Sequence, residues 1–150
     1  MTCVLFVCTG NTCRSPMAES ILRNMAIPGI EVRSAGIFAQ KGSAASTNAK
    51  RVLDEQEIPH DHSASMLDDS LVEWADFILT MTTGHKDNIL VRYPNARSKT
   101  FTLKEFAKLD GHPDIADPFG GPVDIYREAF QEIKETIEKA AEFLQQDHSQ

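Results

Sequence analysis

The chain has 150 residues, of which 41% are hydrophobic and 25% are charged, and its formal net charge is −7. This length is sufficient for one domain with a hydrophobic core and leaves little room for a second, so we expect a single domain over residues 1–150. The excess of acidic side chains argues against nonspecific binding to nucleic acid, and no apolar run approaches the length that spans a bilayer.

The first predicted elements are a short apolar strand and a helix, separated by a polar loop. The strand covers residues 4–7, and the helix begins near Ser15 and Pro16, since proline suits the first helical position. Apolar side chains then recur at helical spacing at Ala18, Ile21, Leu22 and Met25. The loop therefore lies at the C-terminal end of a strand, where ligands bind in parallel α/β sheets.

The rest of the chain alternates between strand and helix patterns. Further strands are predicted at residues 30–34, 77–80 and 100–102, and helices around residues 49–53, 71–75 and 84–91. Residues 36–46 and 110–122 are predicted loops. A last helix has one apolar face, formed by Ile125, Phe130, Ile133, Ile137, Ala140 and Leu144. This alternation predicts a single α/β domain in which helices cover both faces of a four-stranded parallel sheet.

The loop after the first strand has the features of an anion-binding site. A tight turn between a strand and a helix aims backbone N–H groups at one point, and the helix N-terminus adds its positive end. Both effects favour the thiolate form of Cys8, which is the reactive nucleophile. Arg14, six positions later, can offer two parallel N–H donors to two phosphate oxygens.

Other residues of the loop have predicted supporting roles. Gly10 permits a positive φ angle, Asn11 tolerates one better than most residues, and Ser15 can hydrogen-bond the sulfur of Cys8 or the helix start. A cysteine and an arginine at this spacing also occur by chance. The catalytic interpretation therefore depends on the context of the loop, with a strand before it, a helix after it, a glycine within it and a serine following the arginine.

This segment resembles the active-site loop of the low-molecular-weight protein tyrosine phosphatases, in which a cysteine, five residues, an arginine and a Ser or Thr form the first strand-to-helix turn. The resemblance covers nearly the whole chain, including residues 32–36, residues 75–81 and a late Asp117-Pro118 pair. Thr12 replaces the usual aliphatic residue, and residues 119–121 replace a segment that often carries tyrosines. Both departures are similar to the bacterial protein arginine phosphatases, a branch of the same family.

The resemblance implies a phosphatase that works in two steps through a phosphocysteine intermediate on Cys8. Arg14 and the loop N–H groups would hold the phosphoryl oxygens, and Asp117 would protonate the leaving group and then activate water. Spacing alone does not select this acid, because Asp110 and Asp114 lie nearby. The resemblance implies phosphorylated proteins as partners and requires neither a cofactor nor a metal. The residues expected to contact the substrate are Thr9, Gly10, Asn11, Thr12, Cys13, Ser15 and Phe119.

Two substrates stay open, and phosphoarginine is favoured over phosphotyrosine. Thr12 is smaller and more polar than an aliphatic residue, Asp117 can pair with a guanidinium, and Phe119 offers a face on which a guanidinium can stack. The alternative is that Thr12 fills loop space and Phe119 packs. A noncatalytic phosphate-binding or redox-sensing module is a more remote possibility. Thioredoxin-coupled arsenate reductases share the loop but use further cysteines downstream, and none follows Cys13.

The cysteines and histidines complete the sequence-based expectations. All three cysteines lie within the first thirteen residues, without a disulfide framework or metal-site spacing. With no signal peptide, the chain is expected to be cytoplasmic, and a monomer is the working expectation. The family analogy favours a reversible disulfide between Cys13 and Cys8, and a small loop filler is the alternative. The five histidines, including His148, are interpreted as surface or structural residues.

Overall fold

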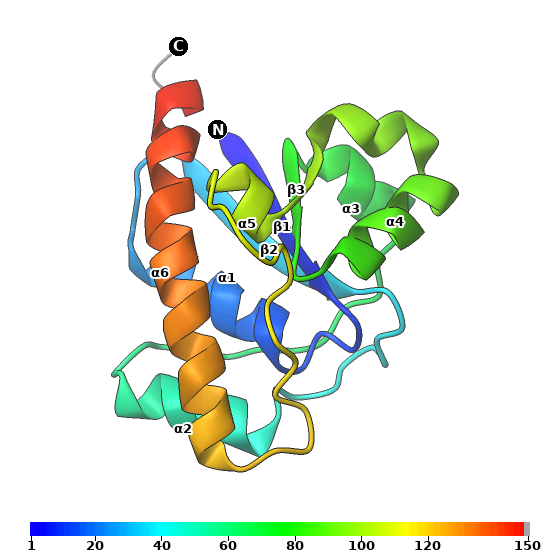
Figure 1. Ribbon diagram of the computed structural model, residues 1–150. Coiled ribbons are helices and arrows are strands. Elements are labelled where there is room, and N and C mark those ends of the chain that lie inside the picture. The colour runs from blue at the N-terminus through cyan, green and yellow to red at the C-terminus, as the bar shows by residue number, and fades with distance from the viewer. Residues whose placement is uncertain (149–150) are drawn as a thin grey trace.

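The computed structural model describes residues 1–148 and has a central sheet of four parallel strands in the order β2-β1-β3-β4 (Figure 1). The strands are β1 (Thr2–Cys8), β2 (Ile30–Gly36), β3 (Phe77–Thr80) and β4 (Thr100–Thr102). The helices are α1 (Arg14–Asn24), α2 (Thr47–Glu55), α3 (Asp69–Trp74), α4 (Thr83–Arg92), α5 (Leu103–Phe106) and α6 (Val123–His148), with a 3-10 helix η1 (Pro94–Lys99).

Each face of the sheet has its own hydrophobic cluster, because side chains of a strand alternate between the faces. On β1, Val4 and Phe6 pack with α1, α2, α5 and α6, whereas Leu5 and Val7 pack with α3 and α4. The two groups of helices lie on opposite sides of the sheet (Figure 1). The predicted fold class is therefore confirmed: an α/β domain with a four-stranded parallel sheet and helices on both faces.

Several element boundaries differ from the sequence-based prediction. β2 extends to Gly36, which was expected to begin a loop, and α1 begins at Arg14, so Pro16 is its third residue. η1 and α5 were not predicted, because six and four residues are too few to show a helical repeat. α5 is stabilised instead by a capping box between Thr102 and Glu105.

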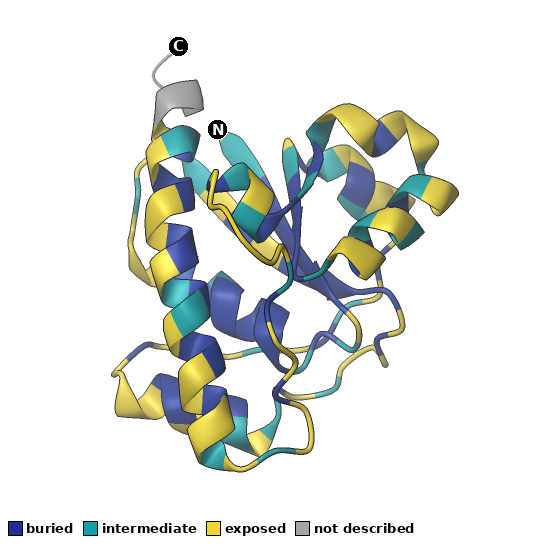
Figure 2. Ribbon diagram, viewed as in Figure 1, coloured by how far each residue is buried: buried dark blue, intermediate teal, exposed yellow. Residues whose placement is uncertain are grey.

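The long helix α6 presents one buried and one exposed side (Figure 2). Most of its predicted apolar face is buried, from Phe130 to Leu144. The assignment of Ile125 to that face is wrong, because this residue is 40% exposed and the neighbouring Tyr126 points inward. No helix in the described part of the chain combines the length and the apolar character that a membrane span requires.

Candidate active site

The loop between β1 and α1 turns at a single residue with left-handed backbone geometry. That residue is Asn11, with a φ of 57° and a fully buried side chain. Gly10, predicted to supply a positive φ, does not have one. Asn11 is held in this conformation from several sides: its amide donates to the hydroxyls of Ser15 and Ser34, and its carbonyl oxygen Oδ1 accepts from the Ser65 N–H.

A pocket of about 280 Å³ opens over this loop. Eight of the ten predicted site residues line it: Cys8, Thr9, Gly10, Thr12, Cys13, Arg14, Asp117 and Phe119. The other two, Asn11 and Ser15, are buried beneath the loop and do not line the pocket. The pocket lies at the C-terminal end of β1, as expected for a parallel sheet.

Cys8 and Arg14 are fixed by short polar contacts. The sulfur of Cys8 lies 2.8 Å from the Ser15 hydroxyl, and both residues are buried. The Arg14 guanidinium donates to the Ile115 carbonyl at 2.8 Å, and its other terminal nitrogen lies 3.6 Å from the Asp117 carboxylate. The guanidinium is therefore oriented before any anion arrives, which reduces the entropy lost on binding.

The segment that carries Asp117 is attached at two points, one just after β3 and one at the start of α4. The Ile115 N–H donates to the Met81 carbonyl, just after β3. The carboxylate of Asp114 accepts from the backbone and the hydroxyl of Thr83 at the start of α4. Burial raises the pKa of Asp114, but these hydrogen bonds outweigh burial and lower the pKa below its usual value. Asp114 is thus occupied as an anchor, whereas Asp117 faces Arg14 at the pocket rim.

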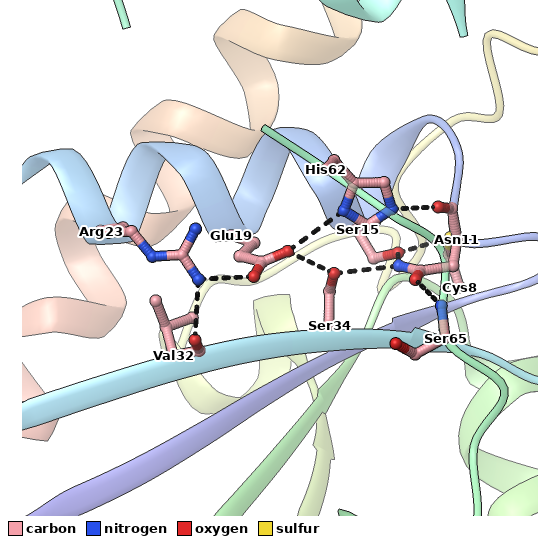
Figure 3. Close-up of polar contacts among 9 residues, drawn as sticks. All are labelled: Cys8, Asn11, Ser15, Glu19, Arg23, Val32, Ser34, His62 and Ser65. Atoms are coloured by element: carbon pink, nitrogen blue, oxygen red, sulfur yellow. Dashed lines mark hydrogen bonds and ion pairs between the residues drawn. The ribbon is translucent and has the colours of Figure 1, made fainter. Parts of the chain in front are cut away.

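A chain of hydrogen bonds runs from the loop between β1 and α1 to Glu19 on α1 (Figure 3). Asn11 donates to both Ser15, at 2.8 Å, and Ser34, at 3.0 Å. Ser34 in turn donates to the Glu19 carboxylate at 2.6 Å. Ser34 therefore links Asn11 in the loop to Glu19 on α1.

His62 closes this network into a ring. One imidazole nitrogen lies 2.6 Å from the Asn11 carbonyl, and the other lies 3.4 Å from the Glu19 carboxylate. Arg23 contacts the other carboxylate oxygen of Glu19 at 2.6 Å. Burial raises the pKa of Glu19, but the hydrogen bonds from His62, Ser34 and Arg23 outweigh it and lower this pKa. The sequence reasoning missed Glu19, although it lies four residues after Ser15 on the same helix face, and nothing local identified His62.

Gly36, the last residue of β2, allows the loop between β1 and α1 to pass close to the sheet. A Cβ atom here would lie 2.6 Å from the Thr9 carbonyl oxygen and 2.9 Å from the Asn11 nitrogen. We expect Gly36→Ala to lower the free energy of unfolding by about 2 kcal/mol, because backbone must move to accept the methyl group. The same shift should misalign the loop and reduce turnover of an aryl phosphate. Urea unfolding and steady-state kinetics measure the two effects.

Gly84→Ala is the matched control for this substitution. Gly84 lies in α4, and its added Cβ would have 3.6 Å to the nearest atom. Replacing a helical glycine with alanine removes backbone freedom from the unfolded chain, so stability should stay unchanged or rise by about 0.5–1 kcal/mol. A Gly36→Ala protein as stable and active as the parent would contradict the close approach.

Two further predictions concern a disulfide between Cys8 and Cys13 and the lack of metal-site spacing. Cys8 and Cys13 are free thiols, and the Cys13 sulfur lies 3.3 Å from the Tyr126 hydroxyl. The disulfide between the two cysteines stays a prediction. Among the described residues, no three side chains of His, Cys, Asp or Glu are grouped as metal ligands, and the side chain of His148 lies outside the described residues.

Comparisons with known proteins agree over nearly the full length. Residues 3–150 match the family described as low molecular weight phosphotyrosine protein phosphatase. A protein-arginine-phosphatase of Geobacillus stearothermophilus is 54% identical, covering 95% of each chain. The protein-tyrosine-phosphatase PtpB of Staphylococcus epidermidis is 38% identical over 91% of this chain and 94% of its own. A solved mutant of YwlE arginine phosphatase with a phosphorylated active site serine superposes with a TM-score of 0.92, at 41% identity and 97% coverage of both chains.

Proposed function

The chain belongs to the low molecular weight phosphotyrosine protein phosphatase family and is a cysteine-based phosphohydrolase, and we propose that it removes phosphate from phosphoarginine in proteins. The single observation that carries the substrate assignment is the joint placement of Thr12, Asp117 and Phe119 around the pocket that contains Cys8. A nucleophilic thiol must stay reduced, so we include a cytoplasmic setting in the proposal.

The first step transfers the phosphoryl group to sulfur. The Cys8 thiolate attacks phosphorus opposite the leaving group, the S–P bond forms and the P–N bond to the arginine side chain breaks. Arg14 and the loop N–H groups stabilise the charge on the phosphoryl oxygens. Asp117 donates its proton to the departing nitrogen, for which its position at the pocket rim is suitable.

The second step releases inorganic phosphate. Water attacks the phosphocysteine while the Asp117 carboxylate accepts a proton from it, and the electrons of the P–S bond return to Cys8 as thiolate. The Ser15 hydroxyl, 2.8 Å from the sulfur, can donate to this thiolate and make it a better leaving group. The phosphorylated serine in the YwlE mutant supports a covalent phosphoenzyme in a relative of this chain.

Three residues of the pocket offer groups that suit a guanidinium leaving group. A guanidinium carries only N–H donors, so its partners must be acceptors or aromatic faces. Asp117 is a carboxylate with an exposed side chain, and Thr12 places a hydroxyl in the wall. Phe119 is 75% exposed, which contradicts the alternative that it packs in the interior. A phosphotyrosine ring carries no N–H donors, so the Asp117 carboxylate and the Thr12 hydroxyl would accept no such hydrogen bonds from it.

Exchange of Thr12 for isoleucine tests this assignment. We expect the parent to prefer a phosphoarginine peptide over the matching phosphotyrosine peptide, and Thr12→Ile to lower that ratio of kcat/KM values by about 10- to 100-fold. The added bulk narrows the pocket, and the lost hydroxyl leaves one guanidinium N–H without a partner. Steady-state kinetics on the two peptides, measured side by side, give the ratio.

Thr12→Ser is the control, because it keeps the hydroxyl and removes only a methyl group. Its ratio should stay within about threefold of that of the parent, since one buried methyl contributes little to discrimination. A parent that prefers the phosphotyrosine peptide would contradict the proposed substrate. An unchanged ratio in Thr12→Ile would remove Thr12 from substrate selection.

A further inference from the structure

Helix α4 places a buried histidine directly against the catalytic loop. His85 is the third residue of α4, and only 8% of its surface is exposed. Its Nε2 atom lies 2.9 Å from the hydroxyl oxygen of Thr9. Thr9 follows Cys8 in the chain and lines the pocket. A residue interpreted from sequence as surface or structural thus contacts a pocket wall.

The protonation state of His85 determines what this contact does. Burial and the nearby charge of Arg14 together lower the pKa of His85 to about 4, although Asp114 and Asp117 act in the opposite direction. The ring is therefore neutral at pH 7 and carries a single N–H group. In this state one ring nitrogen is a donor and the other is an acceptor.

The burial of the other ring nitrogen selects the tautomer. Nδ1 of His85 is buried and has no hydrogen-bond partner among the residues that the structure describes. An N–H group left buried without an acceptor is rarer in folded proteins than an acceptor left without a donor. The proton therefore resides on Nε2, and His85 donates to the Thr9 hydroxyl oxygen.

We infer that His85 is a positioning residue that makes the Thr9 hydroxyl a hydrogen-bond donor to the phosphoryl group of the substrate. Because the Thr9 oxygen accepts from His85, its own proton is free to point into the pocket. The phosphoryl oxygens are acceptors, whereas a guanidinium leaving group offers only donors. The inference rests on the proposed phosphatase activity but not on the choice between phosphoarginine and phosphotyrosine.

A double-mutant cycle with Thr9→Val and His85→Leu tests this inference. Loss of one hydrogen bond to a charged group should lower kcat about tenfold in each single variant. If His85 acts through Thr9, the double variant should be no slower than Thr9→Val alone. We would measure kcat and KM with p-nitrophenyl phosphate and with a phosphoarginine peptide. Both substrates should lose activity by the same factor, because the phosphoryl group is common to them.

His85→Gln and Asn88→Leu serve as controls. Glutamine can place an N–H donor near the position of Nε2, so its kcat should stay within about threefold of the parent. Asn88 lies one turn further along α4 and also has a buried atom without a partner among the described residues. It does not line the pocket, so Asn88→Leu should leave kcat unchanged. Thermal unfolding of each variant separates loss of folding from loss of catalysis.

Three outcomes would overturn the inference. They are an unchanged kcat in Thr9→Val, multiplied rather than shared losses in the double variant, and a loss confined to one of the two substrates. If His85→Leu does not fold, Thr9→Val and His85→Gln still decide the question. A parent that hydrolyses p-nitrophenyl phosphate but not the phosphoarginine peptide would contradict the proposed substrate and leave the role of His85 intact.

Discussion

Cys8→Ser should lower the turnover of p-nitrophenyl phosphate by about 10⁴-fold or more, because a serine hydroxyl is almost entirely un-ionised at neutral pH. The thiol lies at the base of the pocket with 3% of its surface exposed, and serine fits the same space. The Arg14 guanidinium and the loop N–H groups are unchanged, so inorganic phosphate should still bind with an affinity close to that of the parent. Steady-state kinetics and titration calorimetry measure the two properties separately.

Cys3→Ser provides the matched control for this experiment. Cys3 lies on the same strand and is half-buried, but it is not among the residues that line the pocket. Its replacement should leave turnover within about twofold of the parent, as is usual for substitutions away from the site. Residual activity above one part in a hundred in Cys8→Ser would mean that another group is the nucleophile. A parent that binds phosphate without hydrolysing any phosphate ester would be a binding module rather than an enzyme.

Asp117→Asn should reduce kcat by about 10²- to 10⁴-fold, which is the range for loss of a general acid and base. An amide neither protonates the leaving nitrogen nor accepts a proton from water. Its oxygen can still accept from the Phe119 N–H, as Oδ1 of Asp117 does at 3.0 Å, so the local turn should persist. Single-turnover kinetics with the phosphoarginine peptide would measure the chemical step directly.

Asp110→Asn is the control for the acid assignment. Asp110 is exposed and does not line the pocket, so its replacement should leave kcat within about twofold of the parent. Binding of inorganic phosphate should be nearly unchanged in both variants, since neither carboxylate is among the phosphate-binding groups. Equal losses in the two variants, or no loss in Asp117→Asn, would remove Asp117 from the mechanism.

The sequence indicated the proposed nucleophile and its loop because they form one continuous segment. Cys8 and Arg14 are brought together by a strand, a tight turn and a helix start, and each of these has a local pattern. The same reasoning attributed the positive φ to Gly10, whereas Asn11 adopts it. Glycine pays no steric penalty there, but the side chain of Asn11 gains hydrogen bonds that glycine could not make.

The spacing of the aspartates could not select the proposed general acid. Three aspartates occur within eight residues of the same loop, and local patterns treat them alike. In the folded chain, Asp114 accepts hydrogen bonds from Thr83 at the start of α4, whereas Asp117 lies 3.6 Å from Arg14. The family resemblance pointed to Asp117, and its position beside Arg14 in the pocket supports that proposal.

Amphipathic spacing and the order of strands and helices sufficed to establish the α/β class, the parallel sheet and the location of the catalytic loop, since these depend on neighbours in the chain. The supporting contacts of the site required the folded molecule. His62 meets Asn11 across 51 positions, His85 meets Thr9 across 76, and Arg14 meets Ile115 across 101. Such contacts leave no periodic signal, because their energy comes from burial and hydrogen bonding between segments that become neighbours only when the sheet and its helices have packed.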